Sequence, residues 1–175
     1  MGRGLQSYSG RLILRIKRII VFTLFAVYLI CIVYMLFFMR DSLLGWYTYG
    51  EYFRDNTNFV PFRTMTEFFG YLRTDDDIYG DISFENIFGN LAAFLPAGVF
   101  FPAIWKKQRR FGSFLLTASA VIIGVEMIQF TAMCGACDID DFILNIAGAA
   151  AGFALTKSDI IKRLMFIDVS LKKGE

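Results

Sequence analysis

Long apolar runs constrain this chain more than any other feature of its sequence. The segment from Ile19 to Met39 carries no charged residue, and about 20 apolar residues are enough for a helix to cross the ~30 Å hydrocarbon core of a bilayer. Together with three further apolar segments, it predicts four transmembrane helices: Ile19–Met39, Ile87–Trp105, Phe111–Met133 and Phe142–Thr156. The fold class is therefore all-α, a small polytopic membrane protein. The fourth segment is short, and a re-entrant segment is the alternative for it.

Charge along the chain predicts the orientation of these helices. Both terminal tails and the short loop 106–110 are basic, whereas the other two loops carry an excess of acids. Because Lys and Arg are enriched in cytoplasmic segments, this alternation predicts four spans with both termini in the cytoplasm. We expect three parts: a basic cytoplasmic tail (1–18), a membrane domain (19–156) with the extracytoplasmic loop 40–86, and a cytoplasmic amphipathic tail (157–175).

Polar residues interrupt the last three apolar segments at one depth. Helical spacing places them near the outer ends of these segments, in groups that share a helix face: Asn86 and Asn90; Glu126 and Gln129; Asp138, Asp141 and Asn145. An ionisable side chain inside a membrane segment is costly, so its default interpretation is functional. We predict that these side chains form a polar pocket that opens outward, with Arg63 or Arg54 from the long loop as its cap.

The same residues also have structural interpretations. Asn and Gln side chains often join membrane helices, at ~0.6 to 2 kcal/mol each, and this alternative stays open for Asn90, Gln129 and Asn145. Aspartates at the start of the fourth helix could cap it; Asp138 or Asp140 fits that role, whereas Asp141 shares a stripe with Asn145. Glu126 fits a structural role less well, because an ionised carboxylate needs a partner or water unless burial keeps it protonated.

Three short motifs carry local predictions. Gly148 and Gly152 form a small-xxx-small face that allows close helix approach, and we expect packing within the chain rather than dimerisation. The segment Phe59–Phe62 reads as an apolar plug with a turn. Cys134 and Cys137 form either a local disulfide or two free thiols; a metal site is not expected, because the chain has 3 Cys and no His.

The ordered set of these residues resembles the VanZ-like family over roughly residues 58–156. The motifs that carry the resemblance are Asn58-Phe-Val-Pro-Phe62, Asn86, Gly89-Asn90, Phe94, Pro96, Gly98, Pro102, Glu126, Gln129, Asp138-Ile-Asp-Asp141, Asn145, Gly148 and Gly152. The resemblance implies a multi-pass protein of the bacterial cell membrane. The founding member of the family is associated with low-level resistance to teicoplanin, a lipid-tailed glycopeptide antibiotic. The resemblance supplies no biochemical mechanism.

Three classes of function follow as hypotheses. The first is a binding protein for a lipid-linked cell-envelope component or a lipoglycopeptide, with links to teicoplanin-type resistance. The second is an enzyme acting on an envelope lipid, with Glu126 and Asp141 as the catalytic candidates and a divalent cation such as Mg²⁺ bridging them. The third is a small transporter. We expect membrane lipids as partners and no nucleic acid; enzymatic activity and oligomeric state stay open.

Overall fold

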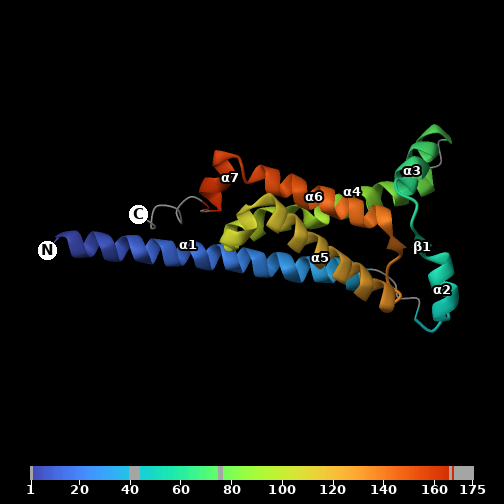
Figure 1. Cartoon of the computed structure of the whole chain (residues 1–175), viewed down its shortest axis with the longest axis horizontal. Coiled ribbons are helices and arrows are strands. Elements are labelled where there is room, and N and C mark those ends of the chain that lie inside the picture. Colours follow the sequence, from blue (N-terminus) through green and yellow to red (C-terminus); the bar gives the residue numbers. More distant parts are fainter. Residues whose placement is uncertain (1, 40–43, 75–76, 166, 168–175) are drawn as a thin grey trace.

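Helices make up almost all of the structure, as expected for an all-α chain. The computed structural model describes residues 2–39, 44–74, 77–165 and 167, and the side chains within these ranges except at 2–11, 72–74 and 77–83. The elements are α1 (Gly2–Val33), the π-helical turn η1 (Tyr34–Phe38), α2 (Tyr49–Asp55), β1 (Thr57–Asn58), α3 (Arg63–Thr74), α4 (Asp77–Ile104), the 3-10 turn η2 (Lys106–Arg109), α5 (Phe111–Thr131), β2 (Cys137–Asp138), α6 (Ile139–Leu155) and α7 (Asp159–Leu164). Helices α1, α4, α5 and α6 lie side by side as an elongated bundle (Figure 1).

Three helices of the described chain are long and apolar enough to cross a bilayer. They occupy Leu12–Phe38, Phe84–Ile104 and Phe111–Thr131. Their outward faces carry exposed apolar side chains such as Ile30 and Leu116, which in a bilayer contact lipid rather than water. Helix α6, at the position of the expected fourth span, has 17 residues, or about 26 Å at 1.5 Å per residue. The chain is a membrane protein.

The helix boundaries differ from the expected ones at two places. Helix α1 begins at Gly2, so the basic segment before Ile19 continues the first span as helix. Helix α4 begins at Asp77 and runs unbroken through Pro96 and Pro102, so the last part of the loop expected at 40–86 is helical. Hydrophobicity marks the membrane-buried part of a helix and carries no signal for the turns beyond it, which explains both differences.

Glycines bring α4 and α6 into backbone contact. A Cβ atom at Gly98 would lie 2.1 Å from the Ala149 carbonyl oxygen, and one at Gly148 would lie 2.0 Å from the Leu91 carbonyl oxygen. Gly152 has the same relation to α4. Small residues are the usual means of close approach in membranes, and packing of the small-xxx-small face within the chain is confirmed.

Aromatic and small side chains fill the space between the four long helices. The buried cluster includes Ile32 and Leu36 of the first span, Phe94, Phe114, Ile122 and Phe153. The rings of Phe114 and Phe153 stack with their centroids 4.9 Å apart. The Tyr28 hydroxyl joins α1 to α4 by donating to the Ala93 carbonyl oxygen at 2.9 Å.

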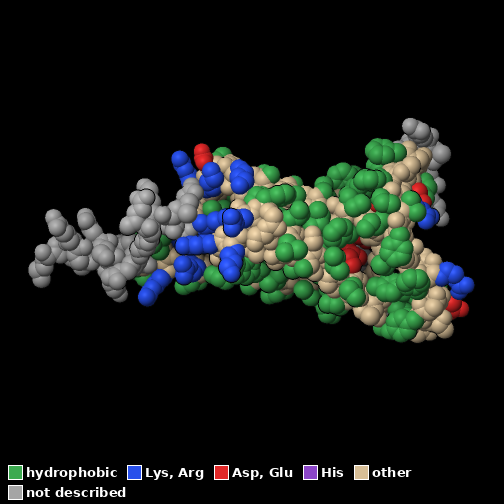
Figure 2. All heavy atoms as spheres, viewed as in Figure 1, with side chains coloured by type: hydrophobic (Ala, Val, Ile, Leu, Met, Phe, Trp, Pro, Cys, Tyr) green, Lys and Arg blue, Asp and Glu red, His purple; other side chains and the backbone are tan. Residues whose placement is uncertain are grey.

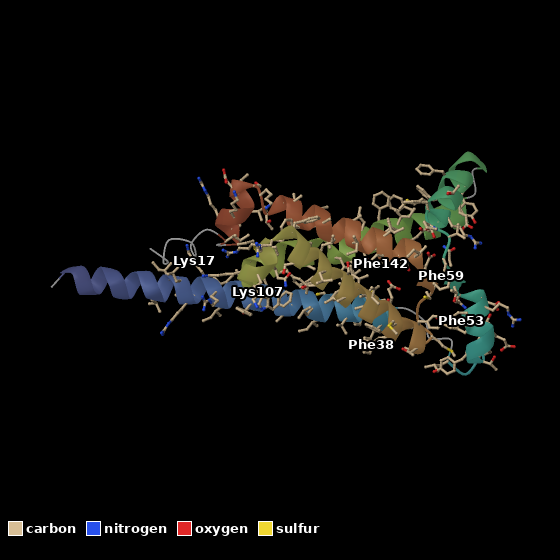
Figure 3. All side chains as sticks on the ribbon, in the orientation of Figure 1. Lys17, Phe38, Phe53, Phe59, Lys107 and Phe142 are labelled. Carbon is tan, nitrogen blue, oxygen red and sulfur yellow. The ribbon has the colours of Figure 1, made fainter. Side chains whose placement is uncertain are left out.

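The two ends of the bundle differ in charge and in structure. Lys and Arg side chains gather at the end near α7 (Figure 2), where Lys17 and Lys107 also lie (Figure 3). We call the opposite end, which carries α2, α3 and the paired strands, the outer end. There Phe59, Val60 and Phe62 are 67%, 61% and 55% exposed, so the expected apolar plug is wrong. The turn holds these side chains away from the bundle, where lipid or headgroups can cover them.

Candidate functional site

Helices α4 and α6 share a buried hydrogen-bonded group at their outer ends. The Asn90 side-chain amide donates one bond to Asn86 Oδ1 and another to Asp141 Oδ1, both at 2.6 Å. Asn90 and Asp141 are each 4% exposed. The spacing of four residues between Asn86 and Asn90 places them on one helix face, and the close approach of α4 and α6 brings Asp141 opposite them.

Helix α5 joins this group through Glu126. The Asn145 amide donates to Glu126 Oε1 at 3.3 Å, and Asn145 lies one turn after Asp141 on the same stripe of α6. Glu126 is partly buried, whereas Asn145 is 2% exposed. Its carbonyl oxygen Oδ1 is buried and accepts no hydrogen bond. We call Asn86, Asn90, Glu126, Asp141 and Asn145 the polar cluster.

Gln129 serves a different contact from the one expected. Its amide donates to the Leu36 carbonyl oxygen in η1 at 2.9 Å, and the side chain is 2% exposed. Leu36 lies in the last turn before this helix ends, where carbonyl groups have no donor within the helix, so the amide from the neighbouring helix satisfies one of them. Gln129 thereby connects α5 to the first span and lies outside the polar cluster.

Asp138 and its neighbour Asp140 organise the outer end. Asp138 caps α6 by accepting from the Asp140 backbone N–H at 2.8 Å, and it also accepts from the Asn58 amide at 2.9 Å. Asp140 is fully buried. Its carboxylate accepts the backbone N–H groups of Phe62 and Thr64, which lie at the start of α3. These two aspartates hold the turn before α3 against α6, so the structure assigns them a structural contact.

A short parallel pairing reinforces the same attachment. Strand β1 pairs with β2 in the register Thr57↔Cys137 and Asn58↔Asp138. The buried Tyr52 of α2 donates its hydroxyl hydrogen to the Gly135 carbonyl oxygen at 2.6 Å. The connection between α5 and α6 (residues 132–138) is therefore held against α2 and β1.

The two candidate capping arginines point to nearer acids. Arg63 forms an exposed ion pair with Glu67 at 2.8 Å, and Arg54 lies 3.8 Å from Asp55. The Glu67 carboxylate, through its hydrogen bond and charge, raises the pKa of Arg63. Among the outer-end side chains that the structure describes, these are the only basic groups, and each pairs with an acid of its own segment.

Cys134 and Cys137 lie beside this acidic region as free thiols. Cys134 is buried and Cys137 is partly buried. Burial raises the pKa of the Cys137 thiol, and the negative charges of Glu126 and Asp138 raise it further. The reactivity of the Cys137 thiol is therefore expected to depend on burial first and on the charge of Glu126 second.

Sequence reasoning missed four residues that hold this region together. They are Tyr52, Asn58, Thr64 and Asp140, which the sequence analysis either left out or treated as local groups. Their partners lie about 80 residues away in the chain, and nothing in the local sequence marks such pairs. The motif Thr48-x-x-Glu51 was readable as a helix start, and it forms a capping box at α2.

The chemistry available at the polar cluster is mainly acceptance of hydrogen bonds. The acceptors are two carboxylates and the orphaned Asn145 oxygen, while the Asn90 amide donates to Asn86 and Asp141 and the Asn145 amide donates to Glu126. Within the described residues, no three His, Cys, Asp or Glu side chains are grouped as they would be around a metal ion. The arrangement suits a ligand that donates hydrogen bonds and carries positive charge or hydroxyls.

Comparison with known proteins gives one match. A family model described as VanZ/LLP1 matches residues 25–163, which include all five residues of the polar cluster and the residues that attach α3 to α6. No curated protein and no solved structure matches the chain significantly.

Proposed function

The chain belongs to the VanZ/LLP1 family, and from this premise we propose that it is a multi-pass protein of the bacterial cell membrane that binds an amphiphile of the cell envelope. The bound molecule is a lipid-linked envelope component or a lipoglycopeptide, and its polar part enters the polar cluster. Through this binding the protein alters the action of teicoplanin-type antibiotics. The link to teicoplanin comes from the founding member of the family.

One observation carries the proposal. Three helices each contribute a buried or partly buried polar side chain to the same place, through the bonds Asn90 to Asp141 and Asn145 to Glu126. Polar groups that served only to join helices would satisfy one another. Here a buried acceptor, Asn145 Oδ1, is left over, and leaving such a group without a partner costs about 1–3 kcal/mol.

The proposed topology has four spans with both termini in the cytoplasm. The clustering of Lys and Arg at the end near α7 supports it (Figure 2), since basic residues are retained on the cytoplasmic side. Helix α6 then acts as the fourth span, and its deficit of about 4 Å against the ~30 Å core is small enough for local thinning. In cells that produce a variant with Cys31 and Cys134 replaced, a membrane-impermeant maleimide should label Cys137 from outside. Labelling of Cys137 only after the cells are permeabilised would show that the protein has the opposite orientation.

Antibiotic susceptibility tests the role of the cluster. Cells that produce wild-type protein should tolerate more teicoplanin than cells that produce Glu126→Gln at the same membrane abundance. The matched control is Glu85→Gln, which changes an exposed glutamate at the same end and should protect as the wild type does. Equal protection by wild type and Glu126→Gln would show that the Glu126 carboxylate is not needed for protection.

An enzyme acting on an envelope lipid is the second candidate. The observation that favours it is the presence of two carboxylates, Glu126 and Asp141, on facing helices with amides that orient them, as acid–base catalysis requires. Purified protein should then convert a lipid-linked substrate, and Glu126→Ala should abolish the conversion while binding persists. If no envelope lipid in a panel is turned over while binding is retained, binding is the only one of the two candidate functions that remains.

A further inference from the structure

The carbonyl oxygen of Asn145 points to the chemistry of the ligand. This side chain is 2% exposed, and its amide nitrogen is fixed by the bond to Glu126 Oε1 at 3.3 Å. The orientation of the amide leaves Oδ1 as a buried acceptor without a donor. A ligand that contacts this oxygen is therefore favoured if it brings a hydrogen-bond donor.

Charge narrows the ligand further. Glu126 and Asp141 add two carboxylates next to Asn145, and both N–H groups of the Asn90 amide already donate, to Asn86 and Asp141. The described basic groups of the outer end, Arg54 and Arg63, pair with their own neighbours. A phosphate or carboxylate would meet negative charge here, whereas a cation with several N–H donors would be stabilised.

The donor arrangement favours an ammonium group over a metal ion. Within the described residues no set of three acidic, Cys or His side chains is placed for metal ligation. A primary ammonium needs fewer anionic partners, because it offers three N–H donors that can be shared among carboxylate and amide oxygens. Asn145 Oδ1, Glu126 and Asp141 together offer such a mixed set.

The position of Glu126 favours a ligand with a hydrocarbon part. Glu126 is partly buried, and Ile123 and Met127 beside it on α5 are 49% and 67% exposed. In a bilayer these side chains face lipid, so a molecule can reach the carboxylate from the membrane while its acyl chains stay in the hydrocarbon.

Resting on the proposed function, we propose that the polar cluster binds the primary ammonium headgroup of a membrane amphiphile. Asn145 Oδ1, Glu126 and Asp141 accept its N–H donors. The headgroup enters from the outer leaflet along α5, and the cluster discriminates against quaternary amines, which carry no N–H, and against uncharged polyols.

Three lipids with the same acyl chains test the inference. Full-length protein in neutral detergent is titrated with dioleoyl phosphatidylethanolamine, phosphatidylcholine or phosphatidylglycerol, and bound lipid is counted by native mass spectrometry. We expect phosphatidylethanolamine, with its primary ammonium, to bind at least tenfold more tightly than the other two. Equal binding of phosphatidylethanolamine and phosphatidylcholine would overturn the inference.

Variants localise the preference. Asn145→Leu and Glu126→Gln should each reduce the preference at least fivefold. The matched control is Gln108→Leu, which removes a similarly orphaned amide oxygen near η2 at the basic end and should keep the preference. If Asn145→Leu does not fold, Glu126→Gln carries the same test. A preference for phosphatidylethanolamine that survives both variants would overturn the site.

The remaining outcomes separate this inference from the proposed function. If Glu126→Gln weakens binding of all three lipids equally, the cluster binds amphiphiles without ammonium selectivity, and only the inference fails. If no lipid responds to either variant, the proposed function fails as well. Thermal stabilisation by Mg²⁺ alone that depends on Glu126, or competition by free ethanolamine at the concentration of the lipid, would overturn the assignment to an amphiphile.

Discussion

Replacing Gly152 with alanine should separate α4 from α6, because the two backbones touch at this residue. The added Cβ would lie 1.9 Å from the Leu95 carbonyl oxygen and 3.1 Å from Gly98 Cα. Ordinary contact begins at 3.4 Å, so the shortfall at the oxygen is about 1.5 Å, well beyond what a non-bonded pair tolerates. Neither partner atom belongs to a flexible side chain that could rotate away, so the helices themselves must move.

The expected cost lies at the upper end of the overpacking range. Forcing extra carbon into a packed interior typically costs about 1–3 kcal/mol, and backbone on both sides places Gly152→Ala at about 3 kcal/mol. Because each 1.4 kcal/mol is a factor of ten, the ratio of folded to unfolded protein should fall roughly a hundredfold. For a chain of this size, the melting temperature should drop by about 6–12 °C.

Thermal unfolding in detergent measures this effect. Wild type, Gly152→Ala and the control Gly124→Ala are fused to a fluorescent reporter, heated and scored for soluble monodisperse protein. A Cβ at Gly124 meets nothing within 4 Å, and alanine favours helix over glycine, so the control should melt at or above the wild-type temperature. If Gly152→Ala melts with the wild type, the close contact of α4 and α6 is refuted.

Other predictions concern the outer end and the first span. Asp140→Asn should expose the turn before α3, because the N–H groups of Phe62 and Thr64 bind different carboxylate oxygens and asparagine keeps only one of them as an acceptor. Hydrogen exchange at those amides should accelerate about tenfold, and unchanged exchange would contradict the attachment. Glu126→Gln should speed alkylation of Cys137 at pH 8, because removing a negative charge lowers the raised pKa of the thiol and increases the thiolate fraction. An unchanged rate would mean that Glu126 carries no charge. Gln129→Leu should cost about 1 kcal/mol in thermal unfolding by leaving the Leu36 carbonyl without its donor, and a stability equal to wild type would show that the bond contributes nothing.

The sequence predicted the helices and the meeting of the polar cluster because both depend on periodicity. Hydrophobic length marks a membrane segment, and spacing of three or four residues assigns Asn86, Asn90, Asp141 and Asn145 to definite helix faces. Alternating helix direction then places these faces at one depth, where the structure shows two hydrogen bonds between helices, from Asn90 to Asp141 and from Asn145 to Glu126. The spacing of Gly148 and Gly152 likewise places both on one face of α6, and this spacing predicted the close packing of that face.

The placement of Gln129, Arg63 and Asp138 could not be predicted from spacing. Gln129 shares a helix side with Glu126, but its amide donates instead to the Leu36 carbonyl oxygen at the end of the first span. Arg63 finds Glu67 one helical turn later, which outweighs a distant and buried carboxylate. Asp138 and Asp140 act on a segment before α3, and such long-range pairs depend on how loops fold back.

The attachment of α3 to α6 has a consequence for how the protein is made. Asn58 and Asp138 are 80 positions apart, and Asp140 lies 78 positions after Phe62. In the proposed topology, the early segment is delivered across the membrane during synthesis, long before its partners leave the ribosome. Strand β2, which pairs with this segment, and Asp140, which accepts its backbone N–H groups, are synthesised only just before or with the last long helix. Assembly of the outer end is therefore a late step of biogenesis, and until α6 is inserted a chaperone or a quality-control protease can recognise this segment.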